Sequence, residues 1–107
     1  MKFDISFMST MQNNTALSLL KALGSPVRLD ILKNLTDGEM CVCTILKQLK
    51  LSQNLVSHHL AILRENDLII ARKEGKWVHY SLNSARFTQL KVFIEDFASG
   101  KNSKSNC

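Results

Sequence analysis

Two cysteines separated by a single residue, Cys41 and Cys43, are the side chains of this sequence best suited to chemistry. Thiolates bind soft ions or oxidise, and the N-terminal end of a helix lowers the pKa of a thiol placed there. On a regular helix, residues i and i+2 point about 200° apart. Both sulfurs can therefore reach one ion only if Cys41 is extended or caps the helix, or if the first turn unwinds. Buried cysteines also pack as small apolar residues, but one helix face cannot bury both, so a ligand-binding pair is favoured.

Other reactive groupings are hard to find in the sequence. His58 and His59 are neighbours on a predicted helix and point in different directions, and nothing nearby completes a set of metal ligands. We expect His58 to face a binding partner and His59 to pack against the β-hairpin that is predicted to follow this helix. Glycine-rich phosphate loops, paired carboxylates and Ser–His–Asp arrangements do not stand out. The sequence therefore predicts a protein that is not an enzyme.

The stretch Leu51–Asn66 is predicted to be a helix displayed toward a partner. Ser52 is a suitable N-cap, and Val56, Leu60 and Leu63 recur at helical spacing and form the face that a core must cover. The opposite face is small, hydrogen-bonding or basic: Asn54, Ser57, His58, Ala61 and Arg64. Amides and hydroxyls read base edges, and recognition helices present their N-terminal ends to the major groove. An ordinary solvated face would have the same pattern on this helix alone. The neighbouring elements favour the interpretation as a DNA-binding helix.

A β-hairpin is predicted to follow this helix. Apolar and polar residues alternate from Val78 to Leu82, Leu68–Arg72 supplies the partner strand, and Lys73–Lys76 form the turn. Beside a helix-turn-helix, such a basic tip is suited to hold phosphates. The candidate DNA contacts are Ser52, Gln53, Asn54, Ser57, His58, Arg64, Arg72, Lys73 and Lys76.

Four further helices are predicted to support these elements. The first is Thr15–Leu23, with Leu17, Leu20 and Leu23 inward. The second has Ser25 as N-cap and Pro26 at its first position, and its apolar residues are Val27, Ile31, Leu32 and Leu35. The third is Cys41–Leu49, and the last runs from Asn83 or Ser84 to Phe97. Cys41–Leu49 and Leu51–Asn66 make a helix-turn-helix. The predicted fold is mainly α with a two-stranded hairpin: a winged helix-turn-helix of about five helices plus the wing. We divide the chain into an arm (1–13), this domain (14–97) and a flexible tail (98–107).

Composition favours an anionic partner and a location in the cytoplasm. Lys and Arg outnumber Asp and Glu by 14 to 9 in the 107 residues, which gives a net charge of +5. No apolar run approaches the roughly 20 residues that span a bilayer, and no signal peptide is evident, so no membrane is expected. The last helix is more apolar than a monomer needs. It therefore predicts a homodimer through the first and last helices.

Four segments together resemble the ArsR/SmtB family of winged-helix repressors, most closely its arsenical-resistance members. They are LGSPVRLDIL (23–32), EMCVC (39–43), VSHHLAILR (56–64) and RKEGKWVHY (72–80). The resemblance covers nearly everything from Thr15 to Phe97. It implies a homodimer that sits on operator DNA when metal-free and leaves when a thiophilic ion binds. The inducer site for As(III) or Sb(III) in the arsenical repressors is the CVC segment, so that role carries to Cys41 and Cys43.

The sequence departs from the arsenical repressors at three positions. Their third cysteine is replaced by Leu46, so a third thiolate for arsenic must come from Cys107, from a small thiol, or from nothing. Asn54 stands where Pro is common in the recognition helix, and Asp67 replaces the usual helix-ending Gly.

Other functions using the same cysteines stay open. Cadmium/lead sensors of the family add cysteines in an N-terminal arm, but residues 1–40 contain none. Zinc sensors use His and carboxylates on the last helix, where this chain has no His. A redox or persulfide sensor of the same fold is the alternative within the repressors. A small thiol redox protein without DNA function is the alternative outside them, but it would need neither a recognition helix nor a basic wing.

Overall fold

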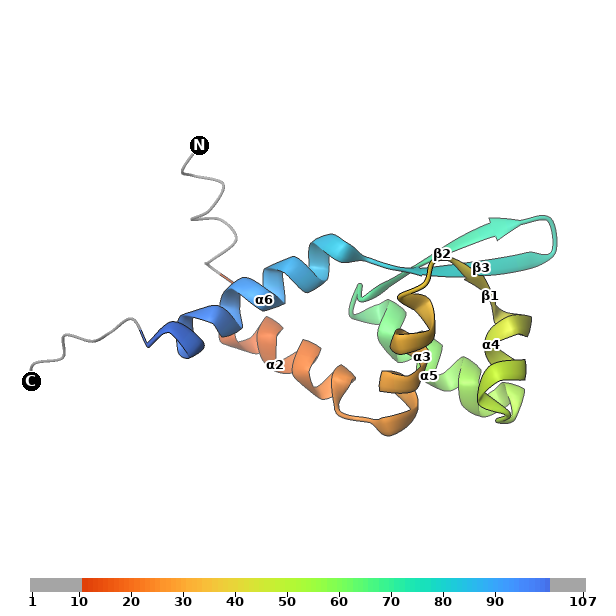
Figure 1. The fold of residues 1–107 in the computed structure, drawn as a ribbon, viewed down its shortest axis with the longest axis horizontal. Coiled ribbons are helices and arrows are strands. Elements are labelled where there is room, and N and C mark those ends of the chain that lie inside the picture. Colours follow the sequence, from red (N-terminus) through yellow and green to blue (C-terminus); the bar gives the residue numbers. More distant parts are fainter. Residues whose placement is uncertain (1–10, 101–107) are drawn as a thin grey trace, which may run out of the picture.

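The computed structural model describes residues 11–100, and the structural statements below concern that part of the chain. It holds five helices and three strands: α2 (Asn13–Leu23), α3 (Pro26–Leu35), β1 (Met40–Cys41), α4 (Val42–Leu49), α5 (Gln53–Glu65), β2 (Ile69–Glu74), β3 (Trp77–Leu82) and α6 (Ser84–Ser99). Figure 1 shows α2 and α6 side by side at one end, and α3, α4, α5 and the sheet at the other. The predicted winged helix-turn-helix is confirmed. No helix in this region is long and apolar enough to cross a membrane.

A single apolar core joins α3, α4 and α5 to the start of the hairpin. Ile31, Ile45, Val56, Leu63 and Leu68 are all fully buried in it. Burying a side chain of this size contributes about 1.5–3 kcal/mol. The core therefore fixes which face of α5 is left outside.

Capping residues set where these helices begin, as predicted. The Ser25 hydroxyl accepts a hydrogen bond from the Arg28 N–H at 3.4 Å, and Pro26 occupies the first position of α3. The Ser52 hydroxyl accepts one from the Leu55 N–H at 3.2 Å, which starts α5. After α5, Asp67 adopts φ 59°, the left-handed conformation expected at the helix stop.

The first helix differs from the prediction in its inward face. Leu17 and Leu20 were expected in the core, but they are 51% and 43% exposed, while Leu19 is fully buried and Ala16 nearly so. Consecutive residues lie about 100° apart on a helix, so the stripe beside the predicted one meets α3, α5 and α6. The helix also begins at Asn13, two residues earlier than predicted.

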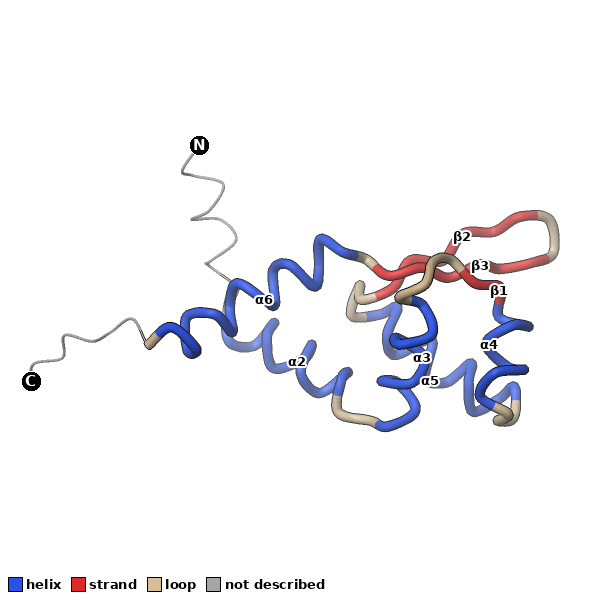
Figure 2. Tube along the Cα trace, viewed as in Figure 1, coloured by secondary structure: helices blue, strands red, loops and turns tan. Residues whose placement is uncertain are grey.

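The sheet contains a strand that the sequence did not reveal. β1 pairs antiparallel with β3, so the strand order is β1-β3-β2 and the predicted hairpin gains a third strand (Figure 2). Two residues are too few to show an alternating pattern. The turn is also shorter than predicted, because Lys73 and Glu74 belong to β2 and only Gly75 and Lys76 connect it to β3.

The last helix runs two residues further than predicted, to Ser99, and ends at Gly100 with φ 58°. The beginning of the expected tail is thus helical. Residues 101–107, including Cys107, and residues 1–10 of the expected arm lie outside the described part of the chain.

Candidate thiol site and nucleic-acid interface

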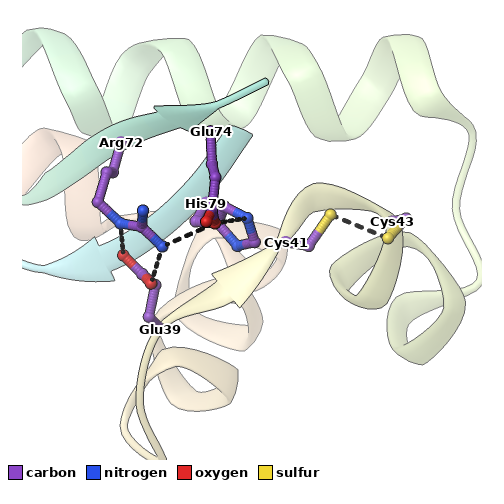
Figure 3. A network of polar contacts seen from close by, with 6 residues as sticks. All are labelled: Glu39, Cys41, Cys43, Arg72, Glu74 and His79. Atoms are coloured by element: carbon purple, nitrogen blue, oxygen red, sulfur yellow. Dashed lines mark hydrogen bonds and ion pairs between the residues drawn. The ribbon is translucent and has the colours of Figure 1, made fainter. Parts of the chain in front are cut away.

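The two cysteines lie at a junction between a strand and a helix. Cys41 ends β1 and caps α4 with an extended backbone (φ −72°, ψ 148°), and the helix begins at Val42. The Cys41 and Cys43 sulfurs are therefore only 2.9 Å apart (Figure 3). The sequence predicted that the two sulfurs could approach each other if Cys41 were extended or capped the helix. The structure shows this arrangement, and the first turn of α4 stays intact. The helix was predicted to start at about Cys41 and starts one residue later, at Val42. Because Cys41 is outside the helix, its side chain can approach that of Cys43.

The environment of Cys41 favours its thiolate. A hydrogen bond from the Cys43 thiol lowers the pKa of Cys41 most, and the backbone N–H groups of Cys43 and Thr44 lower it further. These amides belong to the first turn of α4, whose N–H groups have no partner within the helix. Cys43 is exposed and Cys41 half-buried, so small molecules can reach both. Within residues 11–100 no group of three or more Cys, His, Asp or Glu could hold a metal ion.

Charged side chains connect the cysteine strand to the hairpin. The register places Cys41, His79 and Arg72 in one row across β1, β3 and β2. Arg72 donates to both carboxylate oxygens of Glu39, from Nε at 2.9 Å and from Nη2 at 2.7 Å (Figure 3). Glu74 lies 3.4 Å from both Arg72 Nη2 and His79 Nε2. The hydrogen bonds from Arg72 lower the pKa of Glu39, and those to Glu39 raise the pKa of Arg72.

The outer face of α5 presents most of the predicted base-reading residues to solvent. Gln53, Asn54, Ser57, His58 and Arg64 are all exposed. Ser52 is exposed too, but its hydroxyl is used for capping. A hollow of about 430 Å³ lies between this face and the sheet, lined by Ser57, Leu60, Ala61, Arg64, Glu65 and Tyr80. The helix and the wing thus border one concave surface.

The wing places two lysines near its tip but keeps Arg72 occupied. Lys73 and Lys76 are exposed, and within the described residues neither forms an ion pair. Lys76 Nζ lies 6.0 Å from the ring centre of Trp77, which is 49% exposed. The guanidinium of Arg72 instead binds Glu39. Trp77 was missed as a wing residue, although an aromatic side chain between a basic turn and an alternating strand was visible in the sequence.

The sequence predicted that His59 packs against the hairpin, but in the structure its partner is Arg28 of α3. Its Nδ1 lies 3.2 Å from Nη1 of Arg28 on α3, whose Nε donates to the Ala22 carbonyl at 2.6 Å. Burial lowers the pKa of His59 most, followed by the charges of Arg28 and His58. The next residue, Leu60, is the one that is buried in the core. Arg28 therefore ties α2, α3 and α5 together.

Comparisons with known proteins identify the same fold and the same kind of protein. The family model described as "Bacterial regulatory protein, arsR family" matches residues 25–71. An HTH-type transcriptional regulator of Methanocaldococcus jannaschii is 42% identical over 76% of this chain and 92% of its own length. The arsenical resistance operon repressor of Escherichia coli is 47% identical over 63% of this chain, which spans 58% of that repressor.

A solved structure adds a likeness in three dimensions. Reduced HlyU from Vibrio cholerae has a TM-score of 0.65 and 36% identity, with 77% of this chain and 87% of that chain covered. The extent of these matches, together with the winged helix-turn-helix, places the protein among transcriptional regulators. The chain belongs to the arsR family of bacterial regulatory proteins, which bind DNA and are not enzymes.

Proposed function

We propose that this protein is a repressor that binds operator DNA as a homodimer and releases it when As(III) or Sb(III) binds Cys41 and Cys43. The observation that carries this proposal is the 2.9 Å approach of two accessible sulfurs at a helix N-terminus. Soft thiolates suit a soft metalloid. As each As–S bond forms, a thiol proton leaves with one hydroxide of arsenous acid as water.

The donor set fits such a ligand, with one position left to fill. Cys41 and Cys43 supply two thiolates, and the lowered pKa of Cys41 reduces the cost of removing its proton. Trivalent arsenic prefers three thiolates. Cys107, which lies outside the described residues, or a small thiol in solution is proposed to supply the third.

DNA binding is assigned to the concave surface between α5 and the wing. Gln53, Asn54, Ser57 and His58 lie in the first two turns of α5, the part that recognition helices insert into the major groove. We propose that they read bases. Lys73, Lys76 and Arg64 are proposed to contact phosphates, which position the protein but do not select sequence.

The dimer is assigned to α2 and α6. Among the 16 residues of α6 only Leu90 is buried in the single chain, while Phe97 is 72% exposed and Ile94 43%. Leu17 and Leu20 of α2 are exposed as well. An apolar surface of this kind on a small domain favours a second subunit over solvent.

The proposal is tested by Cys43→Ser, which removes one sulfur and keeps the size of the side chain. We expect the variant to bind operator DNA normally but to stay bound when arsenite is added, as measured by fluorescence anisotropy of labelled DNA. Cys107→Ser is the second variant and tests the proposed third ligand. It should shift the arsenite concentration needed for release and leave release itself intact. Normal release from Cys43→Ser would place the sensor elsewhere.

A redox sensor is the second candidate, and the same sulfur distance favours it. Oxidation by hydrogen peroxide would join the two sulfurs, with two thiol protons and two electrons passing to the peroxide to form two waters. The likeness to a structure described as reduced HlyU supports this second candidate. Release by peroxide that dithiothreitol reverses, without release by arsenite, would favour this function over metalloid sensing.

A further inference from the structure

We infer that Glu39 and Arg72 are positioning residues that transmit ligand binding at the thiol pair to the wing. The inference rests on the proposed thiol-sensing function and adds the route by which that site acts on DNA binding. Neither residue touches the ligand in this scheme. Each acts through the wing to which it is attached.

The first part of the route is the sheet itself. Cys41 is both a candidate ligand and a residue of β1, and it pairs with His79 of β3. His79 in turn pairs with Arg72 of β2. Residues directly opposite each other across strands share one face and lie about 4.5–5.5 Å apart. A change in the backbone at Cys41 therefore reaches both strands of the wing within one row.

The second part is the ion pair beside this row. Glu39 is two residues before Cys41, and both of its oxygens are bound by Arg72. A two-point bond between a guanidinium and a carboxylate fixes direction as well as distance. Glu74 extends the contact to His79 (Figure 3). In the sheet register Glu74 also lies opposite Trp77, near the tip. The segment that carries the thiols is thus held to the wing at two places, by the β1–β3 pairing and by Glu39–Arg72.

This arrangement also explains why Arg72 is a poor candidate for a phosphate contact. Its Nε and Nη2 already bind a carboxylate, whereas Lys73 and Lys76 have no such partner among the described residues. If Arg72 served DNA directly, its loss would reduce the salt dependence of binding by about one phosphate contact. If it serves as a positioning residue, its loss would instead reduce the effect of the thiol ligand.

The test compares Glu39→Ala with Asp37→Ala in the full-length protein. Both substitutions remove one exposed carboxylate from the segment between α3 and β1, but of these two carboxylates only that of Glu39 binds Arg72. The effect of one lost negative charge on DNA affinity cancels in the ratio of affinities without and with arsenite. Such ratios are typically about 5- to 150-fold. We expect Glu39→Ala to reduce the ratio about two- to fivefold, which is what an exposed ion pair can supply, and Asp37→Ala to leave it unchanged.

Two further measurements separate the coupling from the sensing. Titration with a thiol reagent shows whether arsenite still protects Cys41 and Cys43 in each variant. The fluorescence of Trp77, the single tryptophan of the chain, reports on the wing itself. In Glu39→Ala we expect full protection of the thiols but a smaller fluorescence change on adding arsenite.

Arg72→Lys and a charge-swapped pair complete the experiment. Arg72→Lys keeps the charge but loses the two-point geometry, so it should keep the salt dependence and lose part of the arsenite effect. Glu39→Arg combined with Arg72→Glu should recover part of it. If wild type responds to arsenite and Glu39→Ala responds equally, the coupling is overturned and the sensor stands. If arsenite neither protects the wild-type thiols nor weakens DNA binding, the proposed function fails and the coupling fails with it.

Discussion

The backbone conformation of Cys41 determines what its thiol can do. With ψ at 148°, its side chain leaves the strand on the side where Cys43 leaves the first turn of α4. A helical Cys41 would point about 200° away from its neighbour two positions on, and the pair could not share an ion. One residue in the extended conformation thus brings two thiols that would otherwise diverge close enough to bind the same ligand.

His59 is expected to make stability depend on pH. Its pKa is lowered from 6.5, so below about pH 6.5 the unfolded chain binds a proton that the folded protein refuses. The free energy of unfolding should therefore fall as the pH drops from 6.5 toward the folded pKa, and then level off. His59→Gln should remove this part of the pH dependence, as measured by urea unfolding between about pH 5 and pH 8. His58→Gln is the control and should keep most of it.

Helix α6 is anchored to its own subunit along only part of its length. Leu90 and Phe87 pack against the core, but the C-terminal half presents apolar side chains, including the edge-to-face pair Phe93–Phe97 with ring centres 5.4 Å apart. Leu90 is 5% exposed, so a charge there would disrupt the domain itself. A test of the dimer must therefore use the outer residues of α6.

Phe97→Glu is expected to separate the subunits without unfolding them. An unpaired charge buried in an interface costs about 3–5 kcal/mol, so the dimer dissociation constant should rise at least about a hundredfold. Analytical ultracentrifugation would show monomers at concentrations where wild type is dimeric. Ile70→Glu makes the same change at a wing residue that is 49% exposed, and it should leave the dimer intact. An unchanged sedimentation profile for Phe97→Glu would place the interface elsewhere.

The molecule as a whole separates the proposed DNA-binding surface from the proposed dimer surface. The wing and α5 lie at one end and α2 and α6, with their exposed apolar residues, at the other; β1 and α4, which carry Cys41 and Cys43, lie at the same end as the wing (Figure 1). A net charge of +5 attracts DNA in general, and the position of each lysine decides whether it contributes to a contact. Long-range attraction and direct contact can be told apart by salt dependence.

Lys76→Gln should weaken binding to operator and random DNA by the same factor. Losing one phosphate contact reduces the slope of log affinity against log salt by about one unit, because one fewer counterion is released. Lys91→Gln removes the same charge from α6, away from the wing, and should leave that slope unchanged. A loss confined to operator DNA would mean that Lys76 reads bases.

The sequence by itself determined the helices, the hairpin and the orientation of α5. Local signals set these features, because Ser25 and Ser52 cap their own helices and the spacing of Val56, Leu60 and Leu63 allows only one face inward. It also singled out the cysteine pair, whose geometry was limited to a few alternatives by helix periodicity. These inferences needed no information about distant residues.

Only the tertiary structure decided how the thiols are connected to the rest of the molecule. β1 is two residues long and exists because β3, nearly 40 positions later, offers it a partner, so no local pattern could reveal it. The Glu39–Arg72 bond and the contact of His59 with Arg28 likewise join residues more than 30 positions apart. Leu17 and Leu20 point outward for the same reason: periodicity gives the stripes of a helix, but the neighbours packed against it choose which stripe is buried.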